Sequence, residues 1–129
     1  MIAIDTNLVI RYLTGDESRQ SQRSRQIING REVFVPITVL LETEWVLKSS
    51  FRLERAARRK AISDFAGLPT VTVEERHIVA HALDLFGQGM DFADALHLLK
   101  ARHCEGFATF DRKFVKLAQK AGFENVIEG

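Results

Sequence analysis

Four of the acidic residues in this sequence stand at widely separated points of the chain: Asp5, Glu42, Asp94 and Asp111. Carboxylates that gather in one place raise one another's pKa, so such a cluster needs something that offsets the repulsion. A hard divalent cation does this most often, and Mg²⁺ prefers oxygen ligands. A site of this kind suits phosphodiester chemistry, because the ion polarises the phosphoryl oxygen and makes a bound water more acidic. The four residues are therefore candidates for a metal-dependent active site, provided that the fold brings them together.

Each of these acids also has a purely structural interpretation. Asp5 and Asn7 are residue types that favour turns and helix N-caps, and Asp111 is equally suited to cap a helix. Asp91 and Asp94 lie three residues apart, so they share a helix face and complement the positive end of the helix dipole. Capping and metal binding are compatible when one carboxylate oxygen accepts the capping hydrogen bond and the other binds the metal ion.

Glu42 and Glu44 are two residues apart and cannot lie on the same helix face. Apolar residues occupy the helical neighbour positions of Glu42: Val39, Trp45 and Val46. An idle glutamate avoids such surroundings, so Glu42 is the candidate for the site. We expect Glu44 to be solvated and paired with Lys48 at i+4.

Short β-rich runs alternate with longer helical patterns, which is typical of a parallel sheet covered by helices. The expected elements are strand 2–5, helices 7–14 and 17–29, strand 32–35, helices 38–50 and 53–66, strand 70–73, helices 74–86 and 91–103, strand 106–110, helix 111–121 and strand 125–127. Thr38 is expected to cap its helix, and Glu74 and Glu75 to lie in the first turn of theirs. Ligands bind outside the carboxyl ends of strands in an open parallel sheet, so the four acids are expected at one edge.

Composition limits the class of protein. The chain has 129 residues, 46% hydrophobic and 27% charged, with a net charge of +1, which predicts one domain over residues 1–129. Cys104 is the only cysteine, which excludes an intrachain disulfide and a cysteine-built zinc site. No apolar run approaches the roughly 20 residues of a membrane helix, and no basic region precedes the first apolar stretch. We expect a soluble protein of the cytoplasm.

Basic residues concentrate in one region. Arg52, Arg55 and Arg59 fall along one stripe of the helix expected over 53–66, and Arg58 and Lys60 broaden it. The stripe is either an ordinary solvated face or a contact for RNA phosphates. An acidic metal site benefits from such positive charge nearby, because it attracts a polyanion.

Three histidines are of a residue type that binds metal ions. His77 and His81 are four residues apart, a spacing that zinc sites use, but the pattern around them favours a solvated helix face. His97 follows Asp94 by three residues, and we expect a partly buried helix histidine there.

Four motifs contain the candidate acids in this order: Met1-Ile-Ala-Ile-Asp5-Thr-Asn7, Leu40-Leu-Glu42-Thr-Glu-Trp45, Asp91-Phe-Ala-Asp94-Ala-Leu and Ala108-Thr-Phe-Asp111-Arg-Lys-Phe114. Together they resemble the successive motifs of PIN-domain ribonucleases. More narrowly, they resemble those of the VapC-type toxins of bacterial and archaeal toxin–antitoxin pairs. The resemblance covers nearly the whole chain.

The resemblance implies a fold, an activity and partners. The fold is a three-layer α/β/α arrangement, with a central, mostly parallel sheet of four to five strands flanked by helices. The activity is that of an endoribonuclease dependent on Mg²⁺, for which Mn²⁺ substitutes. The implied partners are an RNA substrate, transfer RNA being a frequent target in the family, and a small antitoxin whose C-terminal segment covers the active site. Homodimers are implied as well.

The resemblance also assigns residues. It gives metal binding and catalysis to Asp5, Glu42, Asp94 and Asp111. It makes Asn7 and Thr109 supports of these ligands. The third acid of the family precedes an alanine and a hydrophobic residue, which selects Asp94 and leaves Asp91 beside it in a supporting position.

Two other functions are open at this point. A PIN scaffold could bind RNA or protein without cutting. A receiver-like phosphoacceptor domain also gathers acids at strand ends, but it needs a pair of acids after the first strand, an acceptor aspartate after the third and a lysine after the fifth. Here Asp5 stands alone, the third run ends at Thr72-Val73, and no lysine follows Ile127.

Overall fold

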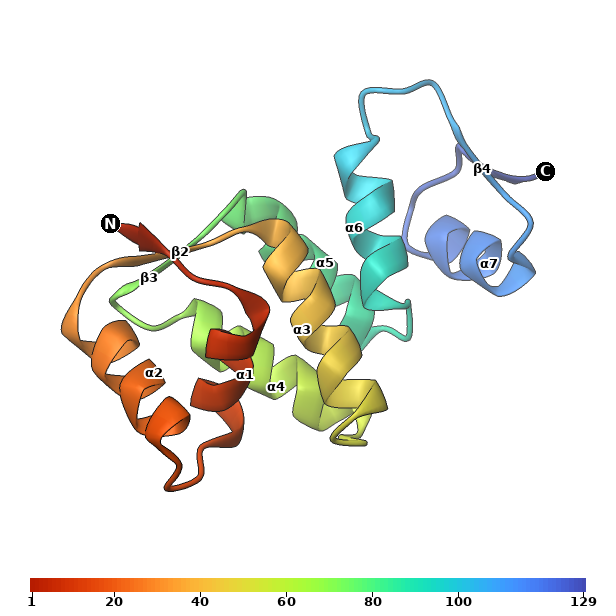
Figure 1. Cartoon of the computed structure of the whole chain (residues 1–129). Helices are drawn as coiled ribbons and strands as arrows, with labels where there is room; N and C mark the ends of the chain where they lie inside the picture. Colours follow the sequence, from red (N-terminus) through yellow and green to blue (C-terminus); the bar gives the residue numbers. More distant parts are fainter. The chain divides into compact units, whose positions relative to one another are not determined.

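The chain repeats a strand followed by two helices three times, and then ends with a strand, a helix and a strand (Figure 1). The computed structural model describes every residue from Met1 to Gly129. These residues form two compact units, Met1–Arg76 and His77–Gly129. The order of all twelve elements is the order expected from the sequence.

A three-stranded parallel sheet forms the base of the first unit. Its strands lie in the order β1 (Ile2–Ala3), β2 (Val33–Val35) and β3 (Val71–Val73). Parallel neighbours require a crossover connection, and pairs of helices supply it here. The connecting helices are α1 (Thr6–Thr14), α2 (Arg19–Gly30), α3 (Ile37–Ser49) and α4 (Arg55–Ala66).

The core of the first unit lies between the middle strand and these helices. Val33 and Val35 of β2 are fully buried, as a central parallel strand requires. Leu40 of α3 and Ile62 of α4 are fully buried as well. The ring of Tyr12 meets the ring of Phe65 edge to face, with centroids 5.7 Å apart, which joins α1 to α4.

The second unit holds a two-stranded parallel sheet and three helices. The strands are β4 (Phe107–Thr109) and β5 (Val126–Glu128), and Ala108 is in register with Ile127. The helices are α5 (Arg76–Gly87), which starts on the last residue of the first unit, α6 (Phe92–Lys100) and α7 (Arg112–Lys120). Phe86 packs on Phe92 and Phe107 on Phe114, with ring centroids 5.7 and 5.5 Å apart.

Four helices begin at a side chain that accepts a hydrogen bond from the first helical turn. The capping residues are Asp5 for α1, Ser18 for α2, Asp91 for α6 and Asp111 for α7. Such caps satisfy amide groups that have no partner inside the helix. Three of the acidic residues singled out in the sequence therefore also determine where a helix starts.

The start of α3 differs from expectation. Thr38 does not cap it, because the helix begins one residue earlier, directly after Pro36, whose side chain has no acceptor. Glu74 was expected inside α5, but it precedes that helix, and its Oε1 accepts the Ile37 N–H at 2.8 Å. A carboxylate 37 residues away thus takes the place of the missing local cap.

The α/β class, with parallel strands flanked by helices, is confirmed. The five strands lie in one sheet of three and one sheet of two. No helix combines the length and the apolarity that crossing a bilayer requires.

Candidate active site

Asp5 lies at the point where β1 passes into α1. Its Oδ1 accepts the Leu8 N–H at 3.1 Å, and the side chain is exposed to solvent. The N-terminus of a helix carries partial positive charge, which favours an ionised carboxylate at this position. The predicted turn and cap are therefore present, and the capping bond uses only one carboxylate oxygen.

Glu42 of α3 and Asp5 line the same pocket. The pocket has a volume of about 440 Å³ and is lined by Asp5, Thr6, Asn7, Ile10, Val39, Glu42 and Val46. The Thr6 hydroxyl donates a hydrogen bond to Glu42 Oε1. Two of the apolar neighbours predicted for Glu42, Val39 and Val46, do line its surroundings. The third, Trp45, points elsewhere and is 61% exposed.

Glu44 and Arg58 overturn two expectations. Glu44 is buried, not solvated, and its Oε2 lies 3.0 Å from Arg58 Nε. Lys48, its expected partner, lies 6.0 Å from the ring centroid of Trp45. Arg58 is buried with Glu44, so it does not broaden the basic stripe. A charge on the inner face of a helix is stable only when it is paired, and each of these residues supplies the other's partner.

The second unit carries the other two candidate ligands together with Asp91. Asp91 caps α6 by accepting the Asp94 N–H at 3.2 Å. Asp111 caps α7 by accepting the Phe114 N–H at 3.1 Å, and its own N–H donates to Thr109 Oγ1 at 3.1 Å. Thr109 therefore holds the backbone N–H of Asp111.

Electrostatics links the three aspartates of this unit. Partial burial raises the pKa of Asp94 above its usual value, and the negative charges of Asp91 and Asp111 raise it further. The nearby His97 opposes this shift in the pKa of Asp94. His97 itself is exposed, not partly buried as expected. Like charges that destabilise one another in this way are relieved by a cation.

The structure thus divides the predicted acids into two sets. Asp5 and Glu42 share a pocket in the first unit, with Asn7 in its wall. Asp94 and Asp111 interact in the second unit, with Asp91 beside them. Within neither unit do three carboxylate, imidazole or thiol side chains form a group that would hold a metal ion by itself. The donors offered are all oxygens, which is the donor set that suits Mg²⁺ or Mn²⁺.

Sequence reasoning missed Thr6. Its hydroxyl donates to the carboxylate of Glu42, whereas the supporting residues predicted from the sequence are Asn7, Thr109 and Asp91. A threonine directly after a candidate ligand is a usable signal, but its partner lies 36 residues away. The sequence alone does not identify that partner.

The remaining candidates have ordinary surroundings. Arg52 and Arg59 are exposed and Arg55 is half-buried, so the shortened stripe remains on the surface. His77 is exposed, as expected, and the ring of His81 lies against that of Phe123 with centroids 6.0 Å apart. Neither histidine belongs to a group that could hold a metal ion.

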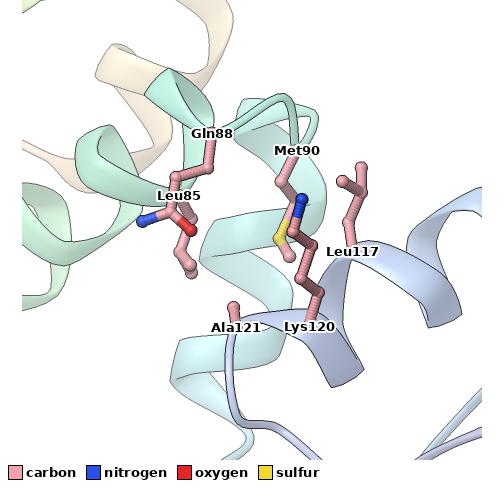
Figure 2. Close-up of a pocket in the computed structure, with 6 residues that line it drawn as sticks. All are labelled: Leu85, Gln88, Met90, Leu117, Lys120 and Ala121. Atoms are coloured by element: carbon pink, nitrogen blue, oxygen red, sulfur yellow. The ribbon is translucent and has the colours of Figure 1, made fainter.

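A separate pocket of about 260 Å³ lies in the second unit. Figure 2 shows the residues that line it: Leu85, Gln88, Met90, Leu117, Lys120 and Ala121. The lining is largely apolar and contains no carboxylate, so this pocket has no ligands for a hard cation. It is distinct from the acidic residues described above.

Comparisons with known proteins find a matching family model and similar solved structures. The family model described as PIN domain matches residues 2–120. Among solved structures, the crystal structure of VapC20 from Mycobacterium tuberculosis, described as a sarcin-ricin loop cleaving toxin, is similar to this chain. The two share 20% identity with a TM-score of 0.39, and the alignment covers 98% of each chain. A search of curated proteins finds no match.

Proposed function

The chain belongs to the PIN-domain family, a family of nucleases, and from this premise we propose that it is a metal-dependent endoribonuclease. The proposed reaction is hydrolysis of an RNA phosphodiester that leaves a 5′-phosphate and a 3′-hydroxyl. The observation that carries the proposal is the order of the four acids, which is that of the family motifs: Asp5 and Asp111 each follow a strand and cap a helix, Asp94 lies in the first turn of α6, and Glu42 lies within α3. The receiver-like alternative has no support from the family match.

We propose that Asp5, Glu42, Asp94 and Asp111 together hold Mg²⁺, for which Mn²⁺ substitutes. A bound Mg²⁺ supplies Lewis acidity, which makes water more acidic and stabilises negative charge that develops on phosphate. Two observations support this donor set. All four side chains offer carboxylate oxygens. Burial raises the pKa of Asp94, and the negative charges of Asp91 and Asp111 raise it further, so a cation would find acids there that repel one another.

The remaining side chains position these acids. Thr6 donates to Glu42 and so orients one carboxylate oxygen, and Thr109 accepts from the Asp111 N–H. Asp5, Asp91 and Asp111 stand at helix N-termini, where the helix dipole favours negative charge on the protein or on a phosphate. Asn7 lines the pocket of Asp5 and Glu42, and we propose that it supports these two ligands.

We further propose that the enzyme is the toxin of a VapBC-type pair. The narrower motif resemblance supports this assignment, and it requires a small antitoxin partner. The proposal includes a homodimer and a cytoplasmic RNA substrate. We also propose that residues 1–129 work as a single domain, because the family match runs across the boundary between the two units.

The test combines cleavage with thermal unfolding. We expect the chain to cut single-stranded RNA with Mg²⁺ or Mn²⁺ and to lose this activity in EDTA. Mg²⁺ should also raise the melting temperature, because the metal binds only the folded chain. This gain should shrink in Asp94→Asn and persist in Asp91→Asn. RNA binding without cleavage in the presence of any metal would favour the non-catalytic scaffold. If the metal-induced rise in melting temperature is lost only in Asp91→Asn, then Asp91 and not Asp94 is the metal ligand.

A further inference from the structure

Phe110 is the most exposed of the large hydrophobic side chains, with 87% of its surface accessible. It stands between Thr109, the last residue of β4, and Asp111, the N-cap of α7. A single exposed hydrophobic residue is common on protein surfaces. This one is directly adjacent to a proposed metal ligand, at the end of a strand, where substrates of parallel sheets bind.

The backbone on both sides of Phe110 is held in place. The Thr109 carbonyl accepts the Gly129 N–H at 2.8 Å, and the Asp111 N–H donates to Thr109 Oγ1 at 3.1 Å. A methyl group added to Gly129 would lie 3.2 Å from Cε1 of Phe110, so the ring rests beside this residue. An aromatic ring presented by a fixed backbone binds a flat ligand with little loss of conformational freedom.

Two basic residues follow Phe110 closely in the sequence. Arg112 and Lys113 follow Asp111 in the first turn of α7, and both are exposed. Glu128 of β5 holds Arg112, with its Oε1 2.9 Å from Arg112 Nε. A flat apolar surface beside cationic side chains is the combination with which proteins bind unpaired nucleotides, since bases stack on rings and phosphates meet cations.

We propose that Phe110 is a stacking platform for an unpaired base of the RNA, next to the bond that is cut. This inference rests on the proposed ribonuclease function and assigns to Phe110 the positioning of one base of the substrate. A base inside a duplex is stacked on its neighbours and cannot lie on the ring. Arg112 and Lys113 contact the phosphates adjoining that base.

The competing occupant of this surface is another protein. Ile127 is 55% exposed and is in register with the exposed Ala108, so the β4–β5 sheet has an apolar surface near Phe110. A protein contact would use all of this apolar area and would not depend on aromaticity. A stacked base requires the ring of Phe110 and not the side chain of Ile127, so the two occupants make opposite predictions.

The experiment measures equilibrium binding of a fluorescent single-stranded RNA of about 12 nucleotides, and of the same strand annealed to its complement. The intact chain is used throughout, with Ca²⁺ in place of Mg²⁺ to prevent cleavage. The variants are Phe110→Leu, which keeps apolar bulk but removes the ring, Phe110→Trp, Ile127→Ser, and Phe51→Leu. Phe51 is the matched control, an exposed phenylalanine of the first unit.

We expect Phe110→Leu to weaken binding of the single strand by about 5- to 150-fold, the range reported for loss of one base–aromatic stack. Phe110→Trp, Ile127→Ser and Phe51→Leu should bind the single strand with nearly the affinity of the unsubstituted chain. Binding of the duplex should be the same in all variants. In Trp45→Phe with Phe110→Trp, the tryptophan at position 110 is the only one, and the single strand should quench its fluorescence.

Three results would overturn the inference. If the unsubstituted chain binds and cuts RNA while Phe110→Leu binds it equally well, the stacking platform is wrong and the proposed function stands. If Phe110→Leu and Ile127→Ser change the sedimentation of the protein but not RNA binding, the surface contacts protein. If the unsubstituted chain neither binds nor cuts RNA, the proposed function fails and the inference fails with it.

Discussion

At the scale of single residues, Asp5 has two tasks that substitutions can separate. It caps α1 through Leu8 and, in our proposal, it holds the metal ion. Asparagine caps helices as well as aspartate does, but it lacks the charge. We therefore expect Asp5→Asn to abolish RNA cleavage and to leave the thermal unfolding of the metal-free chain nearly unchanged.

The matched variant Asp5→Ala removes both the capping hydrogen bond and the proposed metal ligand. It should also abolish cleavage, and it should cost about 0.5–2 kcal/mol of unfolding free energy through the lost cap. Cleavage assays and urea denaturation of the two variants provide the comparison. Full activity in Asp5→Asn would remove this residue from the catalytic set.

Asp94 allows a prediction about pH. Its pKa is raised by burial first, then by Asp91 and Asp111, and it is lowered by His97. In metal-free protein we expect Asp91→Asn to move the pKa of Asp94 down toward the usual 3.8, and His97→Gln to move it up. Carbon NMR titration of the Asp94 carboxyl measures both changes. An unchanged pKa in Asp91→Asn would show that the two carboxylates do not interact.

The sign of the effect on stability follows from linkage. The folded chain holds the Asp94 proton more tightly than the unfolded chain does, so this group favours folding below pH 3.8. That contribution is lost as the pH rises through the raised pKa. Without metal, Asp94 therefore opposes folding at neutral pH, and a bound cation removes this penalty.

At the scale of elements, the pair of Arg58 and Glu44 joins α4 to α3. Both side chains are under 10% exposed, and Arg58 Nη1 also donates to the Leu53 carbonyl at 2.6 Å. Removing one member leaves a buried charge without its partner, so Arg58→Met or Glu44→Leu alone should cost about 3–5 kcal/mol of unfolding free energy.

The double variant provides the control. Arg58→Met with Glu44→Leu removes both charges of this pair, and we expect it to lose much less stability than the sum of the two single changes. Urea denaturation of the three variants gives the coupling energy. Additive losses would mean that the two side chains contribute independently.

The sequence predicted elements better than it predicted partners. Periodicity, glycines and the N-cap residues Asp5, Asp91 and Asp111 gave the order of all strands and helices, because these signals are local. The inward position of Arg58 also had a local signal, since Arg58 shares a helix face with the buried Ile62. The cluster of basic residues around Arg58 predicted a surface position instead, and that prediction was wrong.

Contacts between distant segments could not be predicted. The bond between Thr6 and Glu42 spans 36 residues, and periodicity contains no information about such pairs. The prediction that Glu44 is exposed to solvent was wrong for the same reason, because its partner Arg58 lies on another helix. Which acids belong to the active site was suggested by motif order, and their joint action stays a prediction.

At the scale of the whole molecule, a net charge of +1 gives little attraction for RNA, so binding must depend on where the cations lie. Arg55→Glu together with Arg59→Glu should weaken RNA binding similarly for all sequences. The slope of log affinity against log salt should fall by about one for each lost phosphate contact. Titrations at several salt concentrations, with Ca²⁺ in place of Mg²⁺, measure this slope.

A charge-matched control is available on α2. Arg19→Glu together with Arg23→Glu makes the same change in net charge, and both residues are exposed. If the stripe on α4 contacts RNA, the α2 variant should reduce the salt slope less. Equal slopes in the α4 variant and the unsubstituted chain would show that the stripe is only a solvated helix face.

The bond between Ile37 and Glu74 has a consequence for the dynamics of the first unit. The first turn of a helix ordinarily frays, and its amides exchange with solvent through small local openings. The Ile37 amide is bonded to the side chain of Glu74, which follows β3, so its release requires this carboxylate to leave the start of α3. Its deuterium exchange should be slower than that of helix-start amides whose acceptor lies in the same turn. By contrast, the Ser21 amide, bonded to Ser18 three residues away, should exchange much faster.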